Sequence, residues 1–230
     1  MRNRSIWAIA MVAILSLPNA NAANSTAENL LDSLAVKGRA PKTGYTRAQF
    51  GQTWADVNRN GCDTRNDILK RDLTDVVFRE GTRNCVVESG TLIDPYSGAT
   101  INFIKGEKSS MEVQIDHVVA LSNAWQTGAF KLSLERRTEF ANDPENLLAV
   151  QGRLNSQKGD GDAATWLPPL KKYRCTYVSK QISIKAKYNL WVTTPEKAAM
   201  KNILAKCWFK LCNDRKNFEF RVLLRRGQPK

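Results

Sequence analysis

The sequence contains only one histidine, His117, among its 230 residues. A mechanism that needs two histidines, one acting as acid and one as base, is therefore excluded. The chain also lacks the G-x-S-x-G element of serine hydrolases and the G-x-x-x-x-G-K-S/T loop of nucleotide-binding proteins. No apolar run reaches the ~20 residues that span a bilayer. These absences leave mechanisms that use a single imidazole.

Acidic residues are few compared with basic ones. The chain has 35 Lys and Arg against 22 Asp and Glu, which gives a formal net charge of +13. Its content of 42% hydrophobic and 25% charged residues is that of an ordinary globular protein, and its length fits one domain. So large a positive charge favours a polyanionic partner, either nucleic acid or an anionic cell surface.

Residues 1–22 have the pattern of a secretory signal peptide. Arg2 and Arg4 precede the apolar run Ile6–Leu17, and small residues follow up to Ala22. Cleavage after Ala22 removes two arginines and no acidic residue, so the mature chain of 208 residues keeps a charge of +11. We expect a secreted or periplasmic protein with one domain over residues 23–230 and no membrane attachment after cleavage.

Five cysteines in an exported chain predict two disulfides and one remaining thiol. Cys62 and Cys85 are the preferred first pair, because they close a short loop. Cys175 with Cys207 is the preferred second pair and leaves Cys212, although Cys175 with Cys212 fits the sequence nearly as well. A cysteine zinc site is disfavoured, since the chain has no C-x-x-C pair.

Apolar periodicity predicts the elements of the mature chain. Helices are expected within residues 24–42, over 65–80 and 123–139, from 154 onward and from 195 to about 207. Extended segments are expected at 112–119 and 147–150, and a hairpin within 85–103, where Pro95 and Gly98 mark a turn. Residues 213–230 form a basic C-terminal segment. The centre of the chain therefore has the order strand, connection, strand, helix.

Three short motifs fall on this central part of the chain. They are Ile115-Asp116-His117-Val118-Val119, Asn146-Leu147-Leu148-Ala149-Val150 and Asn155-Ser156-Gln157-Lys158-Gly159-Asp160. Together they resemble the HNH endonucleases of the ββα-metal (His-Me finger) superfamily. Flanking pieces such as Asp94-Pro95-Tyr96-Ser97-Gly98 and Trp166-Leu167-Pro168-Pro169 are similar to its secreted bacterial branch, and the resemblance spans about residues 62–207. It implies an α+β fold with a ββα-metal core, surrounding helices, a small hairpin and disulfides.

The resemblance also implies roles for the first and last motifs. His117 corresponds to the general base, and Asp116 beside it corresponds to a metal ligand. Asn155 corresponds to the second metal ligand, at a position where some members of the superfamily have histidine. Carboxylate and amide oxygens suit a hard cation, so one Mg²⁺, with Mn²⁺ as the second choice, is the expected cofactor.

Further residues complete the expected site. Asn146 corresponds to the residue that holds the loop carrying His117. Lys158, and with less support from the motif Arg136 or Arg137, are expected to pair with phosphate oxygens. The expected reaction is hydrolysis of DNA, with RNA as a further substrate, to a 5′-phosphate and a 3′-hydroxyl. No element that reads base sequence is present, so little sequence specificity is expected.

Each feature also has a simpler explanation. The Asp116–His117 pair alone is as often an ion pair at a strand end, and Lys158 alone is more often a solvated charge. The competing hypothesis is a non-catalytic secreted basic protein that binds nucleic acid or an anionic cell envelope. A monomer is expected, and the sequence leaves open whether the host makes an inhibitor protein.

Overall fold

The structure is a computed structural model that describes residues 20–106 and 111–207, with side chains from Thr26 onward. It confirms the predicted α+β class. The α-helices are α1 (Ala20–Ser33), α2 (Thr64–Asp72), α3 (Leu121–Gln126), α4 (Leu134–Asn142), α5 (Gly152–Lys158), α6 (Arg174–Lys187) and a last helix over residues 194–207. Short 3₁₀ turns are η1 (Arg47–Phe50), η3 (Ala129–Lys131) and η4 (Lys171–Tyr173).

Two small antiparallel sheets accompany these helices. One contains β1 (Leu73–Phe78), β2 (Val87–Ile93) and β3 (Thr100–Ile104) in that order, and β2 with β3 is the predicted hairpin. The other pairs β4 (Val113–His117) with β5 (Leu147–Gln151), and His117 lies opposite Leu147. The predicted strands at 112–119 and 147–150 are thus confirmed.

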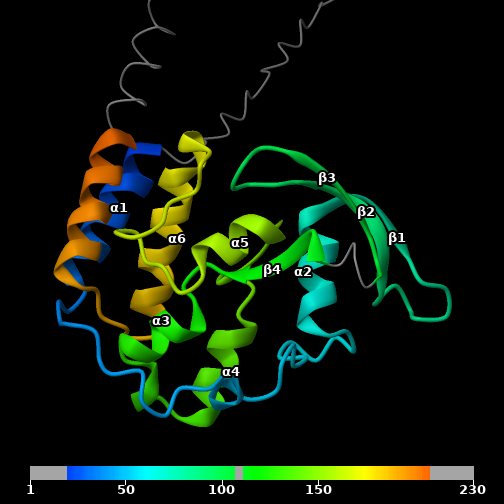
Figure 1. The fold of residues 1–230 in the computed structure, drawn as a ribbon, viewed down its shortest axis with the longest axis horizontal. Coiled ribbons are helices and arrows are strands. Elements are labelled where there is room, and N and C mark those ends of the chain that lie inside the picture. Colours follow the sequence, from blue (N-terminus) through cyan, green and yellow to red (C-terminus); the bar gives the residue numbers. More distant parts are fainter. Residues whose placement is uncertain (1–19, 107–110, 208–230) are drawn as a thin grey trace, which may run out of the picture.

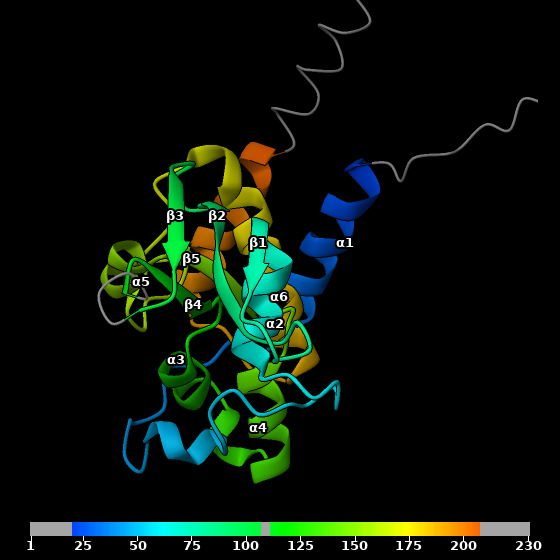
Figure 2. The same ribbon diagram turned by 90° about the vertical axis from the view of Figure 1, so that its right-hand side faces the viewer.

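The order β4, β5, α5 gives the predicted ββα arrangement, because α5 begins directly after β5. Figures 1 and 2 show this unit between the layer that contains α1 and α6 and the three-stranded sheet. Apolar side chains fill both boundaries. Tyr177, Ile182 and Leu204 belong to the core on the helical side, and Leu92 and Phe103 belong to the core under the sheet.

The two faces of β4 have different environments, because successive side chains of a strand point to opposite sides. Val113 and Ile115 belong to the core under the three-stranded sheet. Gln114 and Asp116 point the other way and bond to side chains of α5. The strand therefore carries a polar face toward α5 and ends at His117.

Two predicted helices are shorter than expected. The prediction of a helix over residues 65–80 was wrong beyond Asp72, where α2 ends and β1 begins. The chain is extended there because β1 pairs with β2, through Leu73, Thr74, Val77 and Phe78. Thr74, Val77 and Phe78 are β-branched or aromatic and fit a strand once a partner strand is present. The helix over 123–139 is divided into α3, η3 and α4, and Gly128, at φ 125°, lies in the break.

Both preferred disulfides are present. Cys62 is bonded to Cys85 and Cys175 to Cys207. Most of the expected signal peptide, the basic segment 213–230 and Cys212 lie outside the described residues, and residues 20–22 belong to the first turn of α1. None of the helices in the described ranges has the length and apolar character needed to cross a bilayer.

Candidate active site

A cleft of about 570 Å³ opens where β4 ends. Several separate parts of the chain line it, including the first turn of α2 and the start of α3. Residues 42–54, here called the leading segment, contribute four side chains, β4 contributes Asp116 and His117, and α5 contributes Asn155. The cleft thus brings together one imidazole, one carboxylate and one amide that the sequence separates by up to 39 positions.

His117 is fixed in one tautomer. Its Nε2 atom lies 2.8 Å from the backbone oxygen of Ala141 at the end of α4. Because a carbonyl only accepts, Nε2 carries the proton and Nδ1 keeps its lone pair. Trp54 of the leading segment stacks on the ring at a centroid distance of 6.1 Å. Burial lowers the pKa of His117 to about 3, and the nearby charge of Arg47 acts in the same direction, so the imidazole is neutral at physiological pH.

Asp116 is held by two buried partners. The Tyr96 hydroxyl donates to its Oδ2 atom, and Lys158 Nζ donates to its Oδ1 atom over 2.8 Å. Lys158 also donates to the backbone oxygen of His117 over 2.7 Å. Tyr96 is in place because Asp94, in the turn between β2 and β3, accepts a hydrogen bond from Gln151 N at the end of β5.

These contacts correct the role expected for Lys158. Its side chain is 0% exposed, so it does not reach a phosphate in the cleft. It instead neutralises Asp116 and fixes the backbone at His117. Lys158 is therefore a positioning residue.

The spacing of two polar residues on α5 matches the spacing of two polar residues on β4, so two side-chain hydrogen bonds join these elements. Asn155 and Lys158 are three apart and share a helix face, while Gln114 and Asp116 are two apart and share a strand face. Asn155 Nδ2 donates to Gln114 Oε1 over 2.9 Å, one step along from the Lys158–Asp116 bond. The amide of Asn155 is thereby placed beside Asp116 on the polar face of β4.

The donor set fits a hard divalent cation. The Asn155 Oδ1 atom accepts no hydrogen bond from any residue in the described ranges, and Asn155 and Asp116 line the same cleft. Each oxygen of Asp116 accepts one hydrogen bond and keeps a further lone pair. Mg²⁺ is commonly held by one or two carboxylates with waters at its other positions. The described ranges contain no group of three His, Cys, Asp or Glu residues that could hold a metal ion.

Asn146 lies fully buried beside the loop that follows His117. Its Oδ1 atom accepts from Val119 N over 2.8 Å, and its Nδ2 atom donates to Val119 O over 3.3 Å. Its backbone oxygen accepts from Val118 N over 2.7 Å. One asparagine thus satisfies both backbone groups of Val119 and fixes the chain as it leaves β4.

The positive charge of the cleft comes mainly from residues that the sequence analysis did not single out. Arg47 lies on the leading segment and Arg65 in the first turn of α2, and both line the cleft. Within the described ranges, neither has a salt bridge or a hydrogen-bond partner for its guanidinium group. Lys42 also lines the cleft but pairs with Asp160 at 2.9 Å. Two arginines are therefore available to an anion.

Arg136 and Arg137 do not line the cleft, which corrects their expected role. Arg136 pairs with Glu139 at 2.6 Å and donates to the backbone oxygen of Lys187. Arg137 donates to the backbone oxygens of Gln49 and Leu132. Both guanidinium groups are occupied in joining α4 to neighbouring segments, whereas Arg47 and Arg65 line the cleft.

The sequence analysis did not identify Arg47, Trp54 and Arg65 as site residues, because they lie far along the chain from the three motifs. Tyr96 lies within the turn Asp94-Pro95-Tyr96-Ser97-Gly98, and nothing in that sequence predicts its bond to Asp116. A weak signal existed for Trp54 and Tyr45, since aromatic residues alternate with basic ones in the leading segment. Nothing in the local pattern showed that this segment crosses to β4.

Residues 63–203 match the family described as GmrSD restriction endonucleases, C-terminal domain. The chain belongs to this family. The part that matches the GmrSD C-terminal domain contains α2, both sheets and α5, and hence His117, Asp116, Asn146 and Asn155. It begins after the leading segment.

One relative covers most of the chain. An uncharacterized secreted protein of Arthroderma benhamiae is 40% identical over 185 residues, which cover 80% of this chain and 85% of the relative. No solved structure matches the chain significantly. Together the matches support a nuclease-like family, but they single out neither the bacterial branch nor the ββα-metal superfamily.

Proposed function

We propose that this protein is a secreted, metal-dependent endonuclease that hydrolyses phosphodiester bonds of DNA, with RNA as a further substrate. The observation that carries the proposal is the state of His117. Its ring is neutral, its Nε2–H is donated to Ala141, and its Nδ1 lone pair is left at the cleft. Arg47 and Arg65 line the same cleft and have no salt bridge to any residue that the structure describes. Membership of a family named for restriction endonucleases supports the same reaction.

In the proposed reaction, His117 activates the attacking water and two arginines bind the phosphate. Nδ1 of His117 takes a proton from a water molecule, and the water oxygen forms a bond to phosphorus. The bond between phosphorus and O3′ breaks, and O3′ takes a proton from solvent. The products are a 5′-phosphate and a 3′-hydroxyl. Arg47 and Arg65 are positioned to pair with the phosphate oxygens, whose charge grows during attack.

Asp116 and Asn155 would hold the divalent cation, Mg²⁺ or Mn²⁺. When bound, such an ion supplies positive charge to a phosphate oxygen and to the leaving oxygen. Lys158 and Tyr96 keep the Asp116 carboxylate in a fixed orientation, and Gln114 does the same for the Asn155 amide. Asn146 keeps the peptide after His117 in place.

The charged groups of the cleft favour contacts with phosphate over contacts with bases. Contacts to phosphate carry no direct sequence information, so cleavage with little sequence preference follows. Secretion of the Arthroderma benhamiae relative and the signal-peptide pattern support a protein that meets free nucleic acid outside the cell. A monomer is sufficient, because one chain supplies every residue named.

A cleavage assay tests the proposal. The purified mature protein is incubated with supercoiled plasmid and with single-stranded RNA, in Mg²⁺, in Mn²⁺ and in excess EDTA. Nicking in either metal that stops in EDTA is expected. His117→Ala should abolish it, whereas Arg136→Ala, which changes a basic side chain outside the cleft, should retain it. Cleavage that continues in EDTA would refute the metal mechanism. DNA binding without cleavage in any divalent ion would favour the non-catalytic binding protein.

A further inference from the structure

The loop before α2 has a ligand spacing that the nuclease site does not use. From Asp56 to Asp67 the sequence reads Asp-Val-Asn-Arg-Asn-Gly-Cys-Asp-Thr-Arg-Asn-Asp. Calcium loops of the EF-hand type have twelve residues, with oxygen ligands at positions 1, 3, 5 and 12, a backbone carbonyl at 7 and glycine at 6. Asp56, Asn58, Asn60 and Asp67 occupy those four side-chain positions, and Gly61 occupies position 6.

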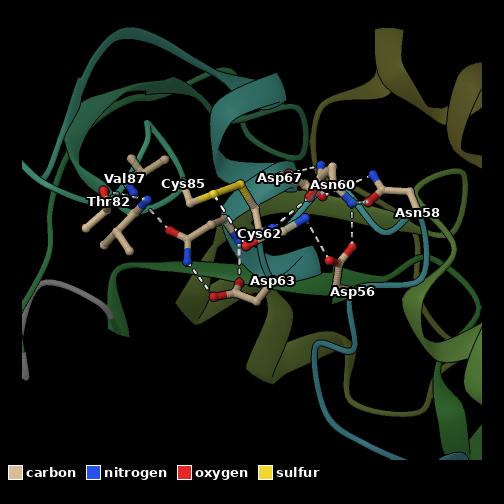
Figure 3. The surroundings of a disulfide bond; sticks show 12 residues. Asp56, Asn58, Asn60, Cys62, Asp63, Asp67, Thr82, Cys85 and Val87 are labelled. Carbon is tan, nitrogen blue, oxygen red and sulfur yellow. Dashed lines mark hydrogen bonds between the residues drawn. A yellow bond between two sulfur atoms is a disulfide. The ribbon is translucent and has the colours of Figure 1, made fainter.

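The fold of the loop agrees with this spacing. Gly61 has φ 87°, a left-handed conformation that glycine adopts without strain, at the position where a calcium loop turns sharply. Asp67 lies in the first turn of α2, as the last ligand of a calcium loop lies at the start of the following helix. Figure 3 shows Asp56, Asn58, Asn60 and Asp67 gathered on one side of Cys62.

The side chains converge on Asp67. Nδ2 of Asn60 lies 3.0 Å from each carboxylate oxygen, and Nδ2 of Asn58 lies 3.3 Å from Oδ2. Asp56 accepts from Asn60 N and Gly61 N at 3.1 and 2.8 Å. The amide groups direct the positive ends of their dipoles at Asp67. Rotation of an amide about its last torsion exchanges nitrogen for oxygen and provides a ligand without moving the backbone.

The charge balance gives an observation independent of the spacing. The protein has 35 basic and 22 acidic residues, yet in the described ranges none of Asp56, Asp63 and Asp67 forms a salt bridge. Six other aspartates in those ranges lie within salt-bridge distance of Lys or Arg, namely Asp32, Asp72, Asp116, Asp143, Asp160 and Asp162. Asp75 and Asp94 have no salt bridge there either and accept hydrogen bonds from neighbouring groups instead. The loop therefore carries the charges of Asp56 and Asp67 with no basic side chain of the described ranges within salt-bridge distance, which leaves both carboxylates open to a cation from solution.

We propose that the loop Asp56–Asp67 binds one Ca²⁺, separate from the cation of the cleft. The ligands are the side chains of Asp56, Asn58, Asn60 and Asp67 and the backbone carbonyl of Cys62. Asp67 stands where calcium loops usually have glutamate, whose longer side chain reaches the ion with both oxygens. Affinity in the range of extracellular modules, with Kd of ~10⁻⁴ to 10⁻³ M, is therefore expected.

The position of the loop gives the ion a structural purpose. Thr64, within the loop, donates through its backbone to Trp54 O over 3.3 Å, and Trp54 stacks on His117. Arg65, the next residue, lines the cleft. The Cys62–Cys85 disulfide fixes the same loop to the turn between β1 and β2. An ion bound here would stabilise the segment that carries two cleft side chains.

Titration of the mature protein with CaCl₂ tests this proposal without measuring nuclease activity. The protein is first stripped with EGTA, and binding is followed by calorimetry and by thermal unfolding. One site is expected, with a rise in Tm of about 3 °C at ten times Kd. No binding heat and no change in Tm up to about 10 mM, ten times the weakest expected Kd, would overturn the proposal.

Matched variants locate the ion. Asp67→Asn keeps an oxygen that can accept from Asn60, so the variant should fold and melt like the wild type in EGTA, yet Kd should rise at least tenfold. Asp63→Asn is the control, because it removes the same charge from the same loop at position 8, which is not a ligand, and Asn retains the helix cap. Equal loss of affinity in both variants would show that only general charge attracts the ion and would overturn the site. Should Asp67→Asn fail to fold, Asp56→Asn provides the same comparison.

Discussion

Lys158 Nζ and Asp116 Oδ1 lie 2.8 Å apart, and their side chains are 0% and 4% exposed. This pair joins α5 to β4 at the residue before His117. Since Lys158 also bonds to the backbone of His117, one buried ammonium connects the candidate metal ligand with the candidate base. The pair is therefore a structural connection within the site, and its removal should affect stability before it affects substrate binding.

Lys158→Met should destabilise the protein by ~3–5 kcal/mol, because it leaves the Asp116 carboxylate buried without its ionic partner. Urea denaturation at neutral pH measures this free energy of unfolding. Lys206→Met, on the exposed side of the last helix, is the control and should change it by no more than about 0.5 kcal/mol. A stable Lys158→Met protein with weakened DNA binding would instead restore the phosphate role.

His117→Ala should lower the cleavage rate by at least ~10², the lower range for loss of a general base. DNA affinity should stay within a few-fold, since Arg47 and Arg65 provide the charged contacts. Single-turnover cleavage and filter binding measure the two quantities separately. Activity that survives within a few-fold would remove His117 from the role of base.

Asn146→Ala should cost ~1–3 kcal/mol of stability, because the backbone N–H and C=O of Val119 lose their buried partners. Urea denaturation gives the total. Amide hydrogen exchange at Val119 gives the local effect, and exchange there should accelerate more than at the other end of β4. An unchanged Val119 exchange rate would contradict this assignment.

Arg47→Ala and Arg65→Ala should each weaken DNA binding and reduce its dependence on salt. Loss of one phosphate contact lowers the slope of log K against log salt by about 0.9 on duplex DNA. Arg136→Ala is the matched control, because its guanidinium pairs with Glu139 outside the cleft. Equal slopes for all three variants would show that the cleft arginines do not contact phosphate.

Acid should destabilise the protein partly through Asp162. Burial raises the pKa of Asp162, but hydrogen bonds and charge attraction from Arg39, together with further hydrogen bonds, outweigh it and hold the pKa below 3.8. The stabilisation is therefore complete above the unfolded value of 3.8 and is lost as the pH falls through the lower folded value. Unfolding free energies measured from about pH 5 downward should fall less steeply in Asp162→Asn. A wild-type slope in that variant would contradict the prediction.

Several local features followed from the sequence because their causes are local. Short apolar runs identified β4 and β5, turn residues identified the hairpin, and spacing within an oxidised chain favoured both disulfides. The strand Leu73–Phe78 was not predicted from the sequence, because these residues continue a helical pattern. They form a strand only through pairing with β2. A propensity of that kind is decided by a partner far along the chain.

The sequence by itself determined the single imidazole, the neighbouring carboxylate, the two asparagines and the excess of positive charge. Only the tertiary structure decided which basic residues meet them. Burial between α5 and β4 turned Lys158 into a partner of Asp116, and bonds to backbone carbonyls occupied Arg136 and Arg137. Arg47 and Arg65 reached the cleft instead. The sequence gives the charge of each side chain, but packing between segments that are distant in the chain determines its solvation and its neighbours.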